Sequence, residues 1–201
     1  MNKEMISPGC SLSELTRRSL SALKGHWFAA FGALFIPTLI QFAVNKLTAG
    51  WGSFFLIPLT CGPLFFFLNL LRQRESRIVQ IFEPMKDFQL YLRFLWAYFR
   101  SIIFVLLWSL LLIIPGIIAA YRYAMVYYIL WDNPNLSVKD AMAESSQIMY
   151  GHKMRFCLYS ILLSLLAFIG TILTLGIGLF WLLPFLASFW TAFYESIRRP
   201  E

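Results

Sequence analysis

Long apolar stretches alternate with short polar segments along most of the chain. Six of these stretches have the length of a membrane-spanning helix, which takes about 20 apolar residues. We expect the spans at about 27–45, 51–71, 94–114, 116–131, 154–173 and 178–197. The pattern therefore predicts an all-α fold, a polytopic membrane helix bundle that forms a single membrane domain over residues 1–201.

Three amphipathic segments each precede an odd-numbered span. We expect a surface helix at 11–25 and elbow helices at about 78–92, broken at Pro84, and at about 137–150. Ser11 and Glu14 have the spacing of a capping box, in which the hydroxyl accepts a hydrogen bond from a free helical amide. Ser137 begins the last amphipathic helix, and Gly151 is placed to end it in the left-handed conformation. These helices should lie along the membrane surface with their basic sides toward the headgroups.

Proline and glycine interrupt two of the predicted hairpins. Pro58, Gly62 and Pro63 fall in the first half of the second span. Because proline removes a backbone donor that lipid cannot replace, this half should be kinked and packed against its neighbours. Pro115-Gly116 is expected to form the turn between the third and fourth spans.

The amphipathic segments and spans also indicate an internal repeat. Residues 19–27 (SLSALKGHW) resemble residues 145–153 (SSQIMYGHK), and His26 and His152 are separated by two periods of 63 residues. Residues 124–134 resemble residues 190–200 in the same way. We therefore expect three copies of one unit, a cytosolic surface helix followed by a hairpin of spans, stacked to bury faces that one copy would leave open.

Composition supports the membrane assignment, because 59% of the residues are hydrophobic and 13% are charged, far from the balance of soluble domains. The net charge of +7 does not indicate nucleic acid in so apolar a chain. All Lys and Arg residues except Lys46 and Arg122 fall on the side of the termini and the amphipathic segments. Positive charge collects on the cytosolic side. We expect both termini in the cytosol and the protein in a bacterial plasma membrane.

The residues indicate neither a metal site nor catalysis. The three cysteines, Cys10, Cys61 and Cys157, are far apart, and His26 and His152 have no Cys or carboxylate cluster nearby. The sequence contains no HExxH pair, phosphate-binding glycine loop or nucleophile elbow. We therefore expect no enzyme and no cofactor.

Arg122 is the most unusual polar residue in the predicted spans. It lies six residues after Gly116, about 9 Å along a helix, and an arginine near the centre of a span costs about 2.5–3.5 kcal/mol on insertion scales. It should face the bundle. One hypothesis is a ligand site for a lipid phosphate or an anionic substrate. The other is a structural role, with Arg122 reaching the outer surface or bonding to free carbonyls, Gln41 or Asn69.

The basic residues of the cytosolic segments are candidates for contact with anionic headgroups. They are Arg17, Arg18, Lys24, Arg72, Arg74, Arg77, Lys153 and Arg155. Glu195, near the end of the last span, is expected to pair with Arg100 or with a charge of the elbow helix. The expected partners are therefore a bilayer with anionic headgroups and a membrane or cytosolic protein, but no nucleic acid.

The chain resembles a known family of bacterial membrane proteins, catalogued as domain of unknown function 975. The resemblance is carried by Ile114-Pro115-Gly116, Tyr121, Tyr123, Tyr128 to Leu130, Asp132, Pro134, Leu136-Ser137, Ala141, Ser145, Met149-Tyr150-Gly151, Lys153 and Phe156. It implies a six-span protein without an established activity. That family is distantly similar to the membrane domain beside some glycerophosphodiester phosphodiesterases, whose catalytic barrel is absent from this chain.

Two functions follow as hypotheses. The first is a non-enzymatic membrane module that binds lipid or a partner protein through its basic cytosolic helices. The alternative is a transporter or lipid-handling protein with a site at membrane depth near Arg122, since broken helices form the sites of known carriers.

Overall fold

The computed structural model describes residues 11–49, 51–74, 76–111 and 113–198, which form helices and turns without a strand. The α-helices are α1 (Leu12–Leu23), α2 (Trp27–Leu47), α3 (Gly62–Leu71), α4 (Glu83–Lys86), α5 (Phe88–Leu111), α6 (Ile113–Arg122), α7 (Val126–Asp132), α8 (Val138–Ile148), α9 (Lys153–Leu173) and α10 (Leu179–Ile197). Two 3-10 helices, η1 (Trp51–Cys61) and η2 (Ile78–Phe82), complete the set. The all-α prediction is confirmed.

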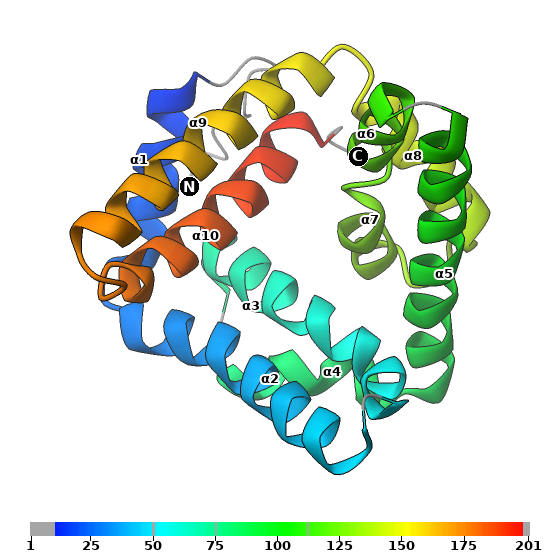
Figure 1. Ribbon diagram of the computed structural model, residues 1–201, viewed down its shortest axis with the longest axis horizontal. Helices are drawn as coiled ribbons and strands as arrows, with labels where there is room; N and C mark the ends of the chain where they lie inside the picture. Colours follow the sequence, from blue (N-terminus) through cyan, green and yellow to red (C-terminus); the bar gives the residue numbers. More distant parts are fainter. Residues whose placement is uncertain (1–10, 50, 75, 112, 199–201) are drawn as a thin grey trace.

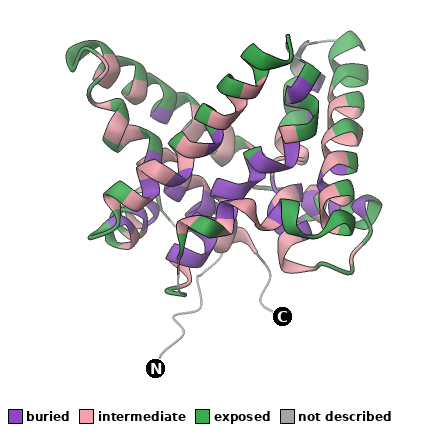
Figure 2. Cartoon of the chain, turned by 90° about the horizontal axis from the view of Figure 1, so that it is seen from below, coloured by how far each residue is buried: buried purple, intermediate pink, exposed green. Residues whose placement is uncertain are grey.

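The long helices form three sides of a triangle (Figure 1). One side consists of α2 and α3, the next of α5 with α6 and α7, and the third of α9 and α10. Helices α2, α5 and α9 lie on the outside, whereas α3, α7 and α10 lie on the inside and carry most of the buried side chains. Figure 2 shows the same division, with buried residues gathered in the middle of the molecule.

The outer helices turn large apolar side chains away from the protein. Phe42 is 63% exposed on α2, Ile103 is 60% exposed on α5 and Leu158 is 63% exposed on α9. Soluble proteins rarely expose a continuous apolar surface of this kind to water. Four helical segments are long and apolar enough to cross a membrane: Trp27–Leu47, Phe54–Leu71, Phe88–Leu110 and Lys153–Leu173. These features indicate a membrane protein.

The inner helices depart from the predicted spans. The first part of residues 51–71 is 3-10 helix around Pro58, and Pro63 lies in the first turn of α3. The expectation of one helix over 116–131 is wrong, because α6 and α7 are separated by a turn at residues 123–125. Helix α6 already begins at Ile113, so Pro115-Gly116 lies in its first turn, not between two helices.

The surface helices α1 and α8 begin with the predicted caps. Ser11 and Ser137 accept hydrogen bonds from the amides of Glu14 and Asp140, so both capping predictions are confirmed. Gly151 has φ +83°, the left-handed conformation expected of a residue that ends a helix.

The predicted elbow helix at 78–92 is broken near Pro84 as expected, but it has a second break at Asp87 and does not form one surface helix. Its residues are divided among η2, α4 and the start of α5. Pro84 lies in the first turn of α4, and Asp87 is extended, with its carboxylate accepting a hydrogen bond from the amide of Gln89 at 2.9 Å. Asp87 therefore caps α5 and stops the preceding helix, because its short side chain competes for backbone amides.

Each surface segment packs against the inner helix that precedes it around the triangle. Helix η2 packs on α3, α8 on α7 and α1 on α10. A hydroxyl fixes the contact of α1 with α10, where Ser188 donates to the carbonyl of Ser19 at 3.4 Å. Another ties α8 to α6, because Ser145 donates to the carbonyl of Arg122, the last residue of α6, at 2.8 Å. The surface segments are thus gathered around the inner helices.

Candidate functional site

The C-terminal ends of α3, α7 and α10 meet in a network of charged side chains, which we call the inner-end network: Arg72, Asp132, Tyr194 and Glu195. Arg72 donates from Nη1 to Oδ1 of Asp132 at 2.7 Å and from Nη2 to Oδ2 at 2.9 Å. Its Nε donates to Oε1 of Glu195 at 2.8 Å. Tyr194 donates its hydroxyl to Oδ2 of Asp132 at 2.8 Å. One guanidinium thus joins three helices.

Because its charged side chains are largely buried, the inner-end network holds the three helices together. The Asp132 side chain is 5% exposed and the Arg72 side chain 14%. The two-pronged contact of a guanidinium with a carboxylate is among the stronger hydrogen-bonded pairs in proteins. A cation is also favourable where the negative ends of three helix dipoles converge. Arg72 was predicted to contact headgroups, but in the structure its donors bind Asp132 and Glu195.

The network also sets the ionisation of Asp132, which lies just beyond the predicted span 116–131. Burial alone raises the pKa of its carboxyl, but hydrogen bonds from Arg72 and Tyr194 and the charges of Arg72 and Arg198 outweigh burial and hold the pKa below its usual value. Arg198 lies 3.4 Å from Oδ2 of Asp132. The ionised carboxylate is therefore part of the folded state.

This lowered pKa predicts a loss of stability in acid. A group whose pKa is lower in the folded protein stabilises it above the unfolded pKa, about 3.9 for Asp, and the contribution disappears as the pH falls through the folded pKa. We expect the difference in free energy of unfolding between the natural protein and Asp132→Asn to be constant near neutrality and to shrink below about pH 4. Denaturant titrations in detergent at several pH values measure this; a difference that grows in acid would contradict it.

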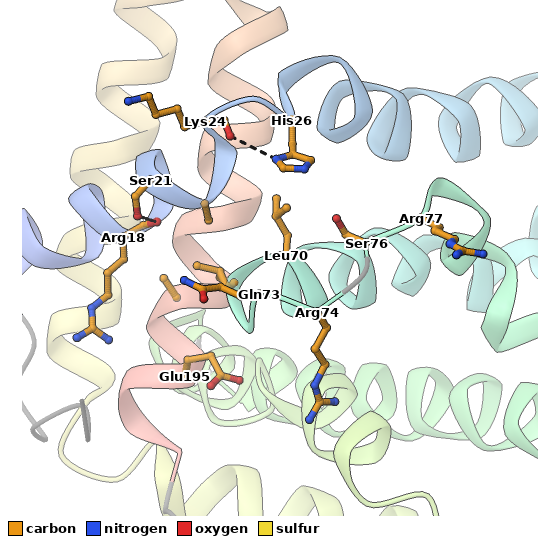
Figure 3. A pocket seen from close by; sticks show the side chains of 13 residues that line it. Arg18, Ser21, Lys24, His26, Leu70, Gln73, Arg74, Ser76, Arg77 and Glu195 are labelled. Atoms are coloured by element: carbon orange, nitrogen blue, oxygen red, sulfur yellow. Dashed lines mark hydrogen bonds between the residues drawn. The ribbon is translucent and has the colours of Figure 1, made fainter. Parts of the chain in front are cut away.

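A large cavity of about 770 Å³ opens beside this network, between α1, the segment after α3, and α10. Its basic lining residues, Arg18, Lys24, Arg74 and Arg77, we call the basic pocket. Figure 3 shows Arg18 and Arg74 extending on either side of Glu195. His26 also lines it, with Nδ1 3.3 Å from the carbonyl oxygen of Lys24. The cavity thus brings together basic residues from two segments far apart in the chain.

The cations of the basic pocket differ in how far they are already paired. Arg18 binds Glu14 at 2.7 Å along α1. Among the described residues, no carboxylate lies in salt-bridge distance of Lys24 or Arg74. Lys24 and Arg74 are therefore the cations with the most capacity for an external anion.

The other predicted headgroup contacts lie outside this cavity. Arg17 is exposed on α1, and Lys153 and Arg155 lie in the first turn of α9. The eight basic residues are therefore divided between the network, the basic pocket and separate surface positions.

The polar residues predicted inside the membrane do not meet. Gln41 donates to the carbonyl of Leu56 at 3.5 Å, and Asn69 donates to the side chain of Gln80 at 3.2 Å. Arg122 is the last residue of α6, and its Nε is buried without a hydrogen-bond partner among the described residues. The structural hypothesis that Gln41 or Asn69 holds Arg122 is wrong.

Glu195 does form an ion pair as predicted, but the predicted partner is wrong, because Glu195 binds Arg72 and not Arg100 or an elbow charge. Sequence reasoning missed Asp132 and Tyr194 as members of a site. A clue was present, since Asp132 and Glu195 are separated by 63 residues, the period of the expected repeat.

The histidines remain separate features. Among the described residues, no three His, Cys, Asp or Glu side chains are grouped so that they could hold a metal ion. Burial and the charge of Arg155 lower the pKa of His152, which favours the neutral ring near pH 7.

Comparison with known proteins identifies the chain at the level of a family. No curated protein and no solved structure matches it. The family described as Protein of unknown function (DUF975) matches residues 95–201, more than half of the chain, from within α5 through α10. This range includes Asp132 and Glu195. The chain therefore belongs to the DUF975 family of proteins of unknown function.

Proposed function

We propose that the protein is a non-enzymatic membrane module that binds anionic lipid headgroups through the basic pocket at the cytosolic end of its helix bundle. The observation that carries this proposal is the cavity of about 770 Å³ lined by Arg18, Lys24, Arg74 and Arg77. Its volume falls in the range of small-molecule sites. A membrane or cytosolic protein with an acidic surface is the competing partner.

The proposal includes six spans arranged as three hairpins, each preceded by a cytosolic surface segment. Three contacts support it, because η2, α8 and α1 each pack against the inner helix of a different side. The hydroxyls of Tyr128 and Thr191, 63 residues apart, lie 3.2 Å from each other. Arg72 binds Asp132 and Glu195, which are also 63 residues apart. Polar groups at the repeat period thus meet where the inner helices converge.

We place the ends of α3, α7 and α10 at the cytosolic face of a bacterial plasma membrane. The excess of Lys and Arg at these ends supports this orientation, because basic residues are retained on the cytosolic side. The same orientation puts the basic pocket at the level of the inner-leaflet headgroups. There, each Lys or Arg near an anionic surface contributes about 1 kcal/mol to attraction.

Neutralising Lys24 and Arg74, which have no carboxylate partner among the described residues, should test the pocket. We expect Lys24→Gln/Arg74→Gln to weaken binding of phosphatidylglycerol by about 10- to 30-fold, since two cations are worth about 2 kcal/mol. Native mass spectrometry of protein in micelles with phosphatidylglycerol, against phosphatidylcholine, measures the retained lipid.

Lys46→Gln is the matched control for Lys24→Gln. Both lysines are exposed at helix ends, but Lys46 follows the first predicted span, at the opposite membrane face. Equal retention of phosphatidylglycerol by the natural protein and the double variant would reject lipid binding as the function. It would favour binding of a protein partner instead.

A further inference from the structure

A second, smaller cavity of about 230 Å³ lies between α5, α6 and α8. Three cations line it, Arg100 from α5, Arg122 from α6 and Lys139 from α8, and we call it the anion cavity. Ser146 adds a hydroxyl, and no Asp or Glu is among its described lining residues. Three like charges around one space repel one another unless an anion lies between them.

Arg122 gives an independent indication of a ligand. Its Nε is buried and lacks a hydrogen-bond acceptor among the described residues. Buried polar groups nearly always have a partner, and an exception is explained by a bound water, a bound ion or a functional role. Since Gln41 and Asn69 bond elsewhere, the acceptor must come from outside the described side chains.

The cavity is held in place on two sides. The hydroxyl of Ser145 donates to the carbonyl of Arg122, which ties α8 to the end of α6. The guanidinium of Arg100 lies 6.0 Å from the centre of the Phe104 ring, within the range of a cation–π contact. Lys139 is exposed in the first turn of α8, so an ion can reach the cavity from the aqueous side.

We propose that Arg100, Arg122 and Lys139 bind a phosphate group, either as inorganic phosphate or as the phosphate of a lipid headgroup. Two guanidinium groups offer forked donors that match phosphate oxygens, and the lysine adds a compact charge. At about 30 Å³ per water in the liquid, the cavity has the volume of roughly eight waters. That volume accommodates one phosphate group with a few waters. This site is separate from the basic pocket and does not depend on it.

Inorganic phosphate is the first probe, added to protein in an uncharged detergent against chloride at equal ionic strength. We expect a saturable rise in Tm with phosphate for the natural protein and no such rise with chloride. Lys139→Gln should weaken the apparent affinity at least fivefold, and Arg122→Gln should abolish saturation. Because Lys139 is exposed, its variant should fold even where Arg122→Gln does not.

Lys46→Gln is the matched control, since it removes an exposed lysine that lines neither cavity. It should leave the phosphate response unchanged. Equal weakening in Lys46→Gln and Lys139→Gln would show an effect of net charge alone and overturn the proposal.

A second arm distinguishes the source of the phosphate. Phosphatidic acid retained in nanodiscs without free phosphate by the Lys24→Gln/Arg74→Gln variant, and lost when Lys139→Gln is added, would identify a lipid headgroup. Saturable binding of inorganic phosphate without such retention would identify the free ion. Failure of both responses would overturn the site. Retention of phosphatidylglycerol through the basic pocket should persist in Lys139→Gln, so the two proposals fail independently.

Discussion

Replacing Arg72 by methionine should lower the free energy of unfolding by about 3–5 kcal/mol, the usual cost of removing one partner of a buried ion pair. The variant leaves Asp132, which is 5% exposed, with only the longer ion-pair contact to Arg198 at 3.4 Å, and it removes the cation that Asp132 shares with Glu195. Three helix C-termini also lose the positive group at their meeting point. Unfolding of purified protein in mixed micelles, followed by circular dichroism, measures the change.

Arg74→Met is the control for this variant, because it removes the same charge two residues later from an exposed position. It should change stability by less than about 0.5 kcal/mol, as most surface substitutions do. Arg72→Lys should fall between the two, since lysine keeps the charge but cannot make the two-pronged contact. If Arg72→Met and Arg74→Met were equally stable, the inner-end network would not hold the helices together.

Substitution of Gly62 by alanine should cost about 2–3 kcal/mol, near the upper part of the range for overpacking a buried site. A Cβ at Gly62 would lie 2.1 Å from the carbonyl oxygen of Ile81 and 2.8 Å from its carbonyl carbon. These are backbone atoms, so relief requires α3 and η2 to move apart. Thermal unfolding should show the loss, together with weaker protection of η2 from proteolysis.

Gly32→Ala, in the neighbouring helix α2, should have the opposite effect on stability. Gly32 lies within α2, where a Cβ would meet side-chain atoms no closer than 3.8 Å. Alanine should therefore stabilise the helix by about 0.5–1 kcal/mol, because glycine has the greater backbone entropy to lose. Destabilisation of similar size in both variants would show that the close approach of Gly62 to Ile81 is not the cause.

Local sequence patterns were sufficient for the fold class and for the caps. The long apolar stretches around α2, α5 and α9 face outward, so their composition alone marks them. Ser11 and Ser137 act through bonds to amides three residues away, which a local motif captures. These features depend on neighbours in sequence.

The inner helices could not be predicted in the same detail. Spacing of apolar residues at 78–92 suggested a surface helix broken at Pro84, but Asp87 interrupts it a second time and caps α5. The turn at residues 123–125 has neither glycine nor proline. There the chain turns where Arg122 offers its carbonyl to Ser145 of α8, a tertiary contact that single-sequence patterns do not contain.

The contacts of the candidate site could not be predicted from local sequence patterns either. Basic residues near Arg72 looked equivalent in sequence, yet Arg72 binds two carboxylates while Arg74 lines an open cavity. The difference arises because Asp132 and Glu195 come from helices 60 and 123 residues away. Similarly, Arg122 was recognisable as costly, but its neighbours Arg100 and Lys139 were brought to it by packing of α5 and α8.

The contact between α1 and α10 has a consequence for biosynthesis. Ser19 and Ser188 are 169 residues apart, and ribosomes add about 5–20 residues per second. The helix that is translated first among those described therefore waits roughly 10 to 30 s for its partner. During that time the face of α1 that packs on α10 in the finished fold has only lipid or a chaperone to cover it. Nascent chains released before α10 should consequently be early substrates for membrane quality-control proteases.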